Sequence, residues 1–156
     1  MKKIVLALML LVGLSSAEDI TPKLVIDLTA GNIETFEKRI LKAIVVNKNY
    51  YESQLQELEV AVVVHGSAYR FFVNDPSKTK YKVDKELLSK YKEFHTRIKS
   101  LESTYNVEFF ACKTGMTKNG LEDKDMLSFV KIVPTSTIAL IDKQNRGYAF
   151  LLVEDK

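Results

Sequence analysis

The chain has 156 residues with a formal net charge of +3 at pH 7, two histidines and one cysteine. Its 23 basic and 20 acidic residues nearly balance, which does not favour a nucleic-acid partner. A single cysteine excludes both an intrachain disulfide framework and a CxxC dithiol.

The first 17 residues have the three-part pattern of a secretory signal peptide. Two lysines begin it, an apolar run from Ile4 to Leu14 follows, and small residues lead to Ala17. We therefore expect cleavage after Ala17 and export to the periplasm. The alternative is an uncleaved membrane anchor, although the apolar run is short for a bilayer span.

Cleavage would leave residues 18–156, the length of one ordinary domain. Loss of the two lysines would lower the net charge from +3 to +1, so we again expect no nucleic-acid partner. No later segment is long and apolar enough to cross a membrane, so we expect no membrane contact after cleavage.

Strand and helix patterns alternate along this domain. Residues 23–28 (KLVIDL) are apolar and β-branched, which predicts a strand. Asn32 is a good helix N-cap, and apolar residues from Ile33 to Ile44 share one helical face, so we predict a helix that ends near residues 47–49. The apolar run within residues 58–66 (LEVAVVVHG) predicts a second strand, covered on both faces.

The second half of the chain continues the alternation. A polar turn leads to Asp84, which we expect to cap a long helix with an apolar face from Leu87 to Leu101. Helical patterns also follow residue 112 and cover residues 135–147. Short apolar runs predict three more strands, at residues 107–112, 130–134 and 148–153.

Strands joined through helices lie parallel and carry helices on both faces. The order of the elements therefore predicts an α/β fold, a three-layer α/β/α sandwich around a five-stranded, mainly parallel sheet. No internal repeat or domain boundary is present, which indicates a single domain.

In this fold class, reactive groups gather at the carboxyl ends of the strands. Asp27, His65 and Cys112 each lie at or near the end of a predicted strand, so we expect them at one edge of the sheet. A helix that begins at Lys113 would place Cys112 at its N-terminus, where backbone N–H groups and the Lys113 ammonium favour the nucleophilic thiolate. The candidate catalytic residues are therefore Cys112, His65 and Lys113.

Each candidate also has an ordinary structural interpretation. Free cysteines are among the most buried residue types, so Cys112 could be a packing residue. A lone histidine such as His65 is more often a hydrogen-bonded structural group, and His95, on the long helix, is expected at the surface. The sequence has no metal-ligand spacing and no phosphate-cradling loop, so we expect neither a metal nor a cofactor.

Four segments taken together resemble the exported, single-domain members of the DsrE/DsrF-like family. They are VIDLTAGN, VAVVVHGSA, VEFFACKTGM and, at the end, VKIVPTSTIALIDKQNRGYAFL. The Val-His-Gly strand end and the strand closed by Ala-Cys are the most specific of these features. The resemblance covers nearly all of the mature chain, and the order and spacing of the segments carry it.

The resemblance implies a DsrEFH-like fold and homo-oligomers such as trimers or hexamers. The better understood members carry sulfur as a persulfide on a cysteine and relay it between proteins, and the matching position here is Cys112. It therefore implies a sulfurtransferase-like carrier with a sulfur donor or acceptor protein as partner. Those relay proteins are cytoplasmic, whereas this chain has an export pattern, so the fold carries over more directly than the activity.

Three functions fit these observations. In the first, Cys112 becomes Cys–S–SH and His65 positions the incoming sulfur. In the second, the protein is a non-catalytic ligand-binding or assembly module, and Cys112 is buried and inert. In the third, it is a thiol redox sensor, which responds through a sulfenic acid or through pairing of Cys112 across subunits.

Overall fold

A computed structural model describes residues 21–156, so the predicted signal peptide lies outside the described residues. Five strands form one sheet in the order β4-β3-β2-β1-β5, and every neighbouring pair is parallel. The strands are β1 (Lys23–Leu28), β2 (Glu59–Val64), β3 (Glu108–Cys112), β4 (Lys131–Val133) and β5 (Ala149–Val153).

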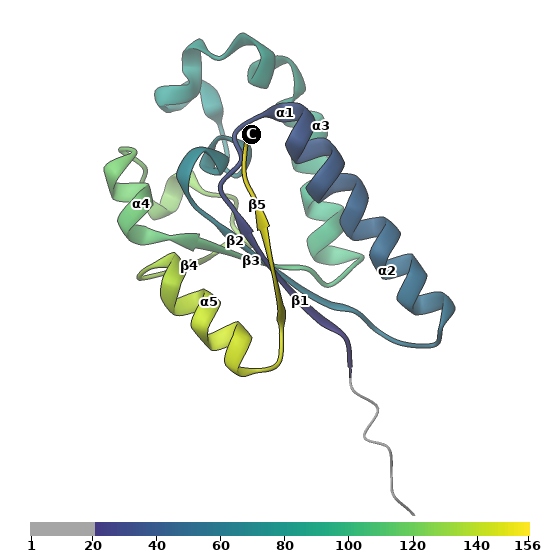
Figure 1. The fold of residues 1–156 in the computed structure, drawn as a ribbon. Helices are drawn as coiled ribbons and strands as arrows, with labels where there is room; N and C mark the ends of the chain where they lie inside the picture. The colour runs from purple at the N-terminus through teal and green to yellow at the C-terminus, as the bar shows by residue number, and fades with distance from the viewer. Residues whose placement is uncertain (1–20) are drawn as a thin grey trace, which may run out of the picture.

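Helices cover both faces of this sheet. One long helix is made of α1 (Ile33–Phe36), the π-helical segment η1 (Glu37–Lys42) and α2 (Ala43–Ser53). The other helices are α3 (Lys85–Ser103), α4 (Lys113–Lys118) and α5 (Ser136–Asn145). Figure 1 shows α2 and α3 on one side of the sheet and α5 on the other, which confirms the predicted three-layer α/β/α sandwich.

Alternate residues of the strands pack into two separate apolar clusters. The larger cluster contains Ile26 and Val62 together with Phe36 of α1. The smaller cluster contains Val25 and Val63, beneath α5. Because both faces are covered, five of the six residues of β2 are buried, as its continuous apolar run predicted.

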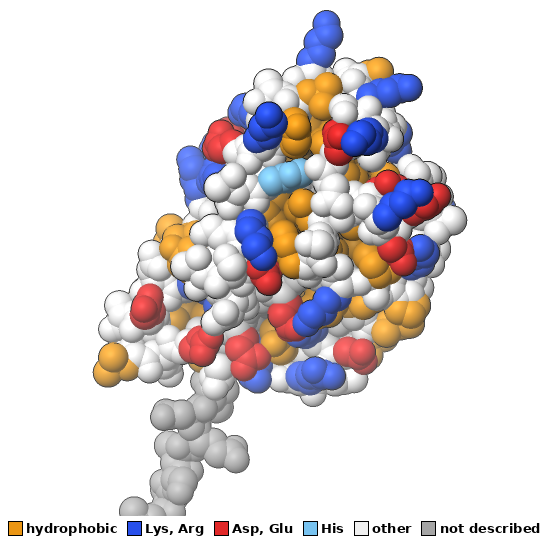
Figure 2. Space-filling model, turned by 180° about the vertical axis from the view of Figure 1, so that it is seen from behind, with side chains coloured by type: hydrophobic (Ala, Val, Ile, Leu, Met, Phe, Trp, Pro, Cys, Tyr) orange, Lys and Arg blue, Asp and Glu red, His pale blue; other side chains and the backbone are white. Residues whose placement is uncertain are grey.

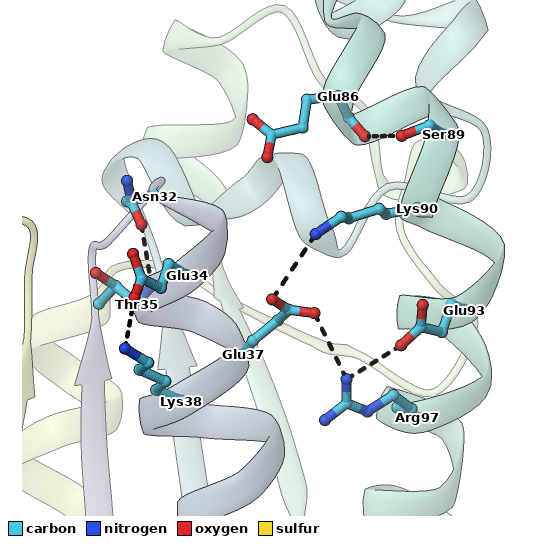
Figure 3. A network of polar contacts seen from close by, with 10 residues as sticks. All are labelled: Asn32, Glu34, Thr35, Glu37, Lys38, Glu86, Ser89, Lys90, Glu93 and Arg97. Carbon is cyan, nitrogen blue, oxygen red and sulfur yellow. Dashed lines mark hydrogen bonds and ion pairs between the residues drawn. The ribbon is translucent and has the colours of Figure 1, made fainter.

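The helices on the larger cluster are joined by aromatic and polar contacts. The rings of Phe36 and Phe94 lie 5.7 Å apart, edge to face, and attach α1 to α3. Outside this contact, Glu37 of η1 lies 3.8 Å from both Lys90 and Arg97 of α3 (Figure 3). These partly exposed ion pairs orient the two helices and add little to stability.

Two details differ from the sequence predictions. The first helix continues to Ser53, beyond the predicted end near residues 47–49, because Lys48 is buried on it and Tyr51 packs against the core. Tertiary packing here outweighs the weak helix propensity of the asparagines. His95 is partly buried rather than at the surface, and burial lowers its pKa.

The long connection from β2 to α3 consists of three short 3₁₀ segments. They are η2 (Gly66–Phe71), η3 (Pro76–Lys78) and η4 (Lys80–Val83). Asp84 then caps α3 by accepting the Leu87 N–H at 3.0 Å, as predicted. On the face drawn in Figure 2, basic and acidic side chains are interspersed with apolar ones. No helix within residues 21–156 is long and apolar enough to span a bilayer.

Candidate thiol site at the carboxyl edge of the sheet

Parallel pairing brings the three strand-end candidates to one edge of the sheet. Asp27 is the next-to-last residue of β1, His65 follows β2, and Cys112 ends β3. The last β2–β3 pair is Val64 with Ala111, so His65 and Cys112 follow it at equivalent positions on adjacent strands. Both residues keep extended backbones, and adjacent strands lie about 4.8 Å apart.

Cys112 is both the last residue of β3 and the N-cap of α4. Its Sγ accepts the Gly115 N–H at 3.4 Å, and the residue is only 6% exposed. The start of a helix presents backbone N–H groups without intrahelical partners, and the one from Gly115 is directed at this sulfur. The low exposure is equally consistent with a packing role, because the residue belongs to the larger apolar cluster.

A buried tyrosine and a glycine fix the backbone around the thiol. The Tyr69 hydroxyl donates to the Cys112 carbonyl at 2.7 Å, and burial raises the pKa of Tyr69 so that it remains a donor. Gly115 allows this approach, since a Cβ at this position would lie 2.3 Å from Tyr69 Oη. Sequence reasoning missed both residues, although a glycine inside the short helix KTGMTK is a signal of close packing.

His65 forms its hydrogen bond with Asp27. His65 Nε2 lies 2.5 Å from Asp27 Oδ1, and the side chains are 26% and 14% exposed. The backbone N–H of His65 donates to Leu28 at 3.1 Å, and Gly66, at φ +60°, ends the strand directly afterwards. No hydrogen bond within residues 21–156 joins His65 to Cys112.

Lys113 has a partner other than the thiol. Its Nζ lies 2.5 Å from Asp123 Oδ1, in the loop after α4, and both side chains are largely exposed. The carboxylate offsets the positive charge that Lys113 brings to the start of α4. The contact that the structure shows at Cys112 Sγ is therefore a backbone N–H, while the Lys113 ammonium pairs with Asp123.

A cavity of about 540 Å³ opens at the same edge, between the start of α1 and the segment after β5. Asp155 fills part of it, because its carboxylate accepts the N–H groups of Gly31 at 2.7 Å and Asn32 at 3.1 Å. Within the described part of the chain, no three histidine, cysteine or acidic side chains gather as a metal site.

Comparisons with known proteins agree with this architecture. The DsrE/DsrF-like family matches residues 23–152. An uncharacterized protein of Aquifex aeolicus (strain VF5) is 29% identical over 106 residues, an alignment that covers 64% of this chain and 47% of that protein. The chain therefore spans about half the length of this curated relative.

Among solved structures, the fold is similar to MTH1491, a protein of unknown function from Methanobacterium thermoautotrophicum. The TM-score is 0.59 at 18% sequence identity, with 84% of this chain and 98% of that chain covered. At this identity the likeness shows the fold alone, and it supports the five-stranded α/β arrangement described above.

Proposed function

Because the chain belongs to the DsrE/DsrF-like family, which has a sulfur-relay-like fold, we propose that it carries sulfane sulfur as a persulfide on Cys112. The observation that supports this most directly is the position of the thiol. Cys112 Sγ caps α4 and accepts the Gly115 N–H, an environment that stabilises the anion of a thiol or of a persulfide. The export pattern at the N-terminus supports a periplasmic location for this carrier.

The proposed transfer needs one cysteine and no external oxidant. The Cys112 thiolate attacks the outer sulfur of a donor R–S–SH, a persulfide or polysulfide. The S–S bond of the donor breaks as the new S–S bond on Cys112 forms, and R–S⁻ leaves and takes up a proton. Delivery is the same exchange with an acceptor thiolate as the attacking group, so a donor and an acceptor protein complete the cycle.

Two structural features bear on how the carrier would meet its partners. Cys112 is 6% exposed, so loading requires local opening. The helix that it caps, α4, has only six residues and is the segment that would open. On the edge strand β5, Phe150 is 48% exposed and Leu152 is 41% exposed. These apolar side chains on an unpaired edge support a homo-oligomer, a trimer or hexamer, and light scattering of the purified protein tests that assembly.

Intact mass spectrometry tests the proposed function directly. The purified protein is measured before and after exposure to polysulfide, with and without a reductant. We expect a reducible gain of sulfur in the wild type and none in the Cys112→Ser variant, because Cys112 is the only thiol in the chain. Sulfur gained by the variant would contradict the proposal.

The burial of Cys112 favours one second candidate, a non-catalytic module in which the thiol only packs. Labelling with iodoacetamide separates the two. A loadable thiol reacts in the folded protein near neutral pH, whereas a packing cysteine reacts only after denaturation. No sulfur gain together with labelling confined to the unfolded chain would support the module.

A further inference from the structure

A lysine buried at the amino-terminal edge of the sheet has no partner in the described part of the chain. Lys48, on α2, is 9% exposed, yet no hydrogen bond or ion pair within residues 21–156 involves its ammonium group. Lys143 is 7% exposed and pairs with Glu108. Buried ammonium groups are rarely left unpaired, because their loss of water is costly. The ammonium of Lys48 therefore indicates a place for a negatively charged group that this part of the chain does not supply.

Lys48 lines a cavity of about 290 Å³ that is separate from the thiol site. The turn after α2 supplies Leu58, and the turn after α3 supplies Tyr105 and Asn106. Both turns lead into the starts of parallel strands, β2 and β3, so the cavity lies at the opposite edge of the sheet from Cys112 (Figure 1). Small-molecule sites span about 300–1,000 Å³, so this cavity suits a ligand smaller than a typical drug.

Charged groups of both signs surround this cavity. Glu52 and Glu57 also line it, are exposed, and take part in no ion pair within residues 21–156. Burial lowers the pKa of Lys48, and the negative charges of Glu57 and Glu59 oppose that effect without an ion pair. Glu59 is already engaged by Lys23 at 3.0 Å. A simple anion would pair with the lysine and be repelled by the two glutamates of the cavity, whereas a ligand with both a carboxylate and an ammonium group matches all three charges.

We propose that this cavity binds a free α-amino acid with an apolar side chain. The carboxylate of the ligand pairs with the Lys48 ammonium, and its ammonium group pairs with the carboxylates of Glu52 and Glu57. Its side chain lies against Leu58, which is buried, and the partly buried ring of Tyr105. This binding goes beyond the proposed sulfur chemistry and does not depend on it.

Titration with L-leucine and two truncated analogues tests the charge pairing. One analogue, 4-methylpentanoate, lacks the ammonium group of leucine, and the other, 3-methylbutylamine, lacks its carboxylate. In nitrogen-15 NMR spectra of the purified protein, we expect leucine to shift the backbone amide signals of Leu58, Tyr105 and Asn106 saturably. Each analogue should bind about 10-fold more weakly or worse, because it leaves a charged group of the site unpaired. Equal binding of leucine and 4-methylpentanoate, or no saturable shift with either leucine or valine, would overturn the inference.

Variants of the lining residues locate the binding. Lys48→Met retains an apolar side chain and removes the charge, so it should weaken leucine binding about 10-fold or more. Glu57→Gln removes one partner of the ligand's ammonium group and should weaken binding as well. Lys42→Met changes an exposed lysine of the same continuous helix, and this control should bind leucine as the wild type does. Leucine binding that is unchanged in Lys48→Met would contradict the proposed site.

Urea unfolding distinguishes a ligand-binding lysine from a structural one. If no group of the protein pairs with Lys48, ligand-free Lys48→Met should be at least as stable as the wild type, because an apolar chain replaces a buried charge. Leucine should then raise the unfolding midpoint of the wild type by more than that of Lys48→Met. A ligand-free Lys48→Met variant that is less stable than the wild type would show that the protein itself supplies the partner, and the inference would fail.

Discussion

Replacing Gly115 by alanine should destabilise the protein, although alanine is the better helix former. Gly115 lies inside α4, and a Cβ there would be 2.3 Å from Tyr69 Oη and 3.1 Å from Cζ. Tyr69 is fully buried, so its ring has little room to move. The hydroxyl that must give way is the one that donates to the Cys112 carbonyl.

Three contributions set the size of the effect. Alanine in place of glycine in a helix interior gains about 1 kcal/mol. Forcing an extra carbon into a well-packed site costs about 1–3 kcal/mol. A buried hydroxyl that loses its acceptor costs about 1–3 kcal/mol more. The losses together exceed the gain, and we expect Gly115→Ala to lower the free energy of unfolding by about 1–5 kcal/mol.

Urea unfolding of a double-mutant cycle isolates this contact. Tyr69→Phe removes the hydroxyl and its hydrogen bond to the Cys112 carbonyl, and should cost about 1 kcal/mol. In that background Gly115→Ala should cost at least about 1 kcal/mol less than in the wild type. Thr117→Ala, an exposed change in the same helix, is the control and should be near neutral. An equal cost of Gly115→Ala in both backgrounds, or a Gly115→Ala variant as stable as the wild type, would show that the contact with Tyr69 is not the cause.

The polar network beneath α5 gives two further expectations. Lys143 is 7% exposed, pairs with Glu108 and lies over two aromatic rings, so Lys143→Ala should lower the free energy of unfolding by about 2 kcal/mol in urea. Lys131→Ala removes the other, exposed partner of Glu108 and should cost under about 1 kcal/mol; equal costs would show that burial does not set the effect. The second expectation concerns acid. The Tyr148 hydroxyl lowers the pKa of Glu59, and hydrogen bonds from the two lysines lower the pKa of Glu108 against the opposing effect of burial. Both carboxylates therefore stabilise the fold at pH values above their unfolded pKa near 4.5. This stabilisation is lost as the pH falls through the lower pKa values that the two groups have in the folded protein. The decline in unfolding free energy between about pH 5 and pH 3 should be shallower in a Glu59→Gln/Glu108→Gln variant, and equal declines would contradict the assignment.

The layers of the fold could be predicted from local patterns, whereas the order of the strands could not. Apolar runs and helix caps such as Asn32 and Asp84 depend on nearby residues, and all five strands lie where these patterns placed them. The position of β5 beside β1 depends on pairing between residues such as Leu24 and Ala149, which are far apart in the sequence. No local pattern encodes that choice.

The candidate site also combines features that the sequence could predict with contacts that it could not. The rule that polar groups lie at strand ends placed Asp27, His65 and Cys112 at one edge, because a parallel sheet aligns its carboxyl ends. The contact between Asp27 and His65 joins residues 38 positions apart, and that between Tyr69 and Cys112 spans 43. Each depends on a side chain's direction as well as its position, and that direction follows only from the assembled register.

The neighbours of Cys112 distinguish its two interpretations better than its burial does. A cysteine that only fills space needs apolar contacts, which the larger cluster supplies. It does not need a backbone N–H directed at its sulfur, and the Gly115 N–H supplies one. In the proposed carrier, burial would also shield a persulfide from small thiols between loading and delivery. An exposure of 6% is therefore compatible with a carrier, provided that α4 opens when a partner binds.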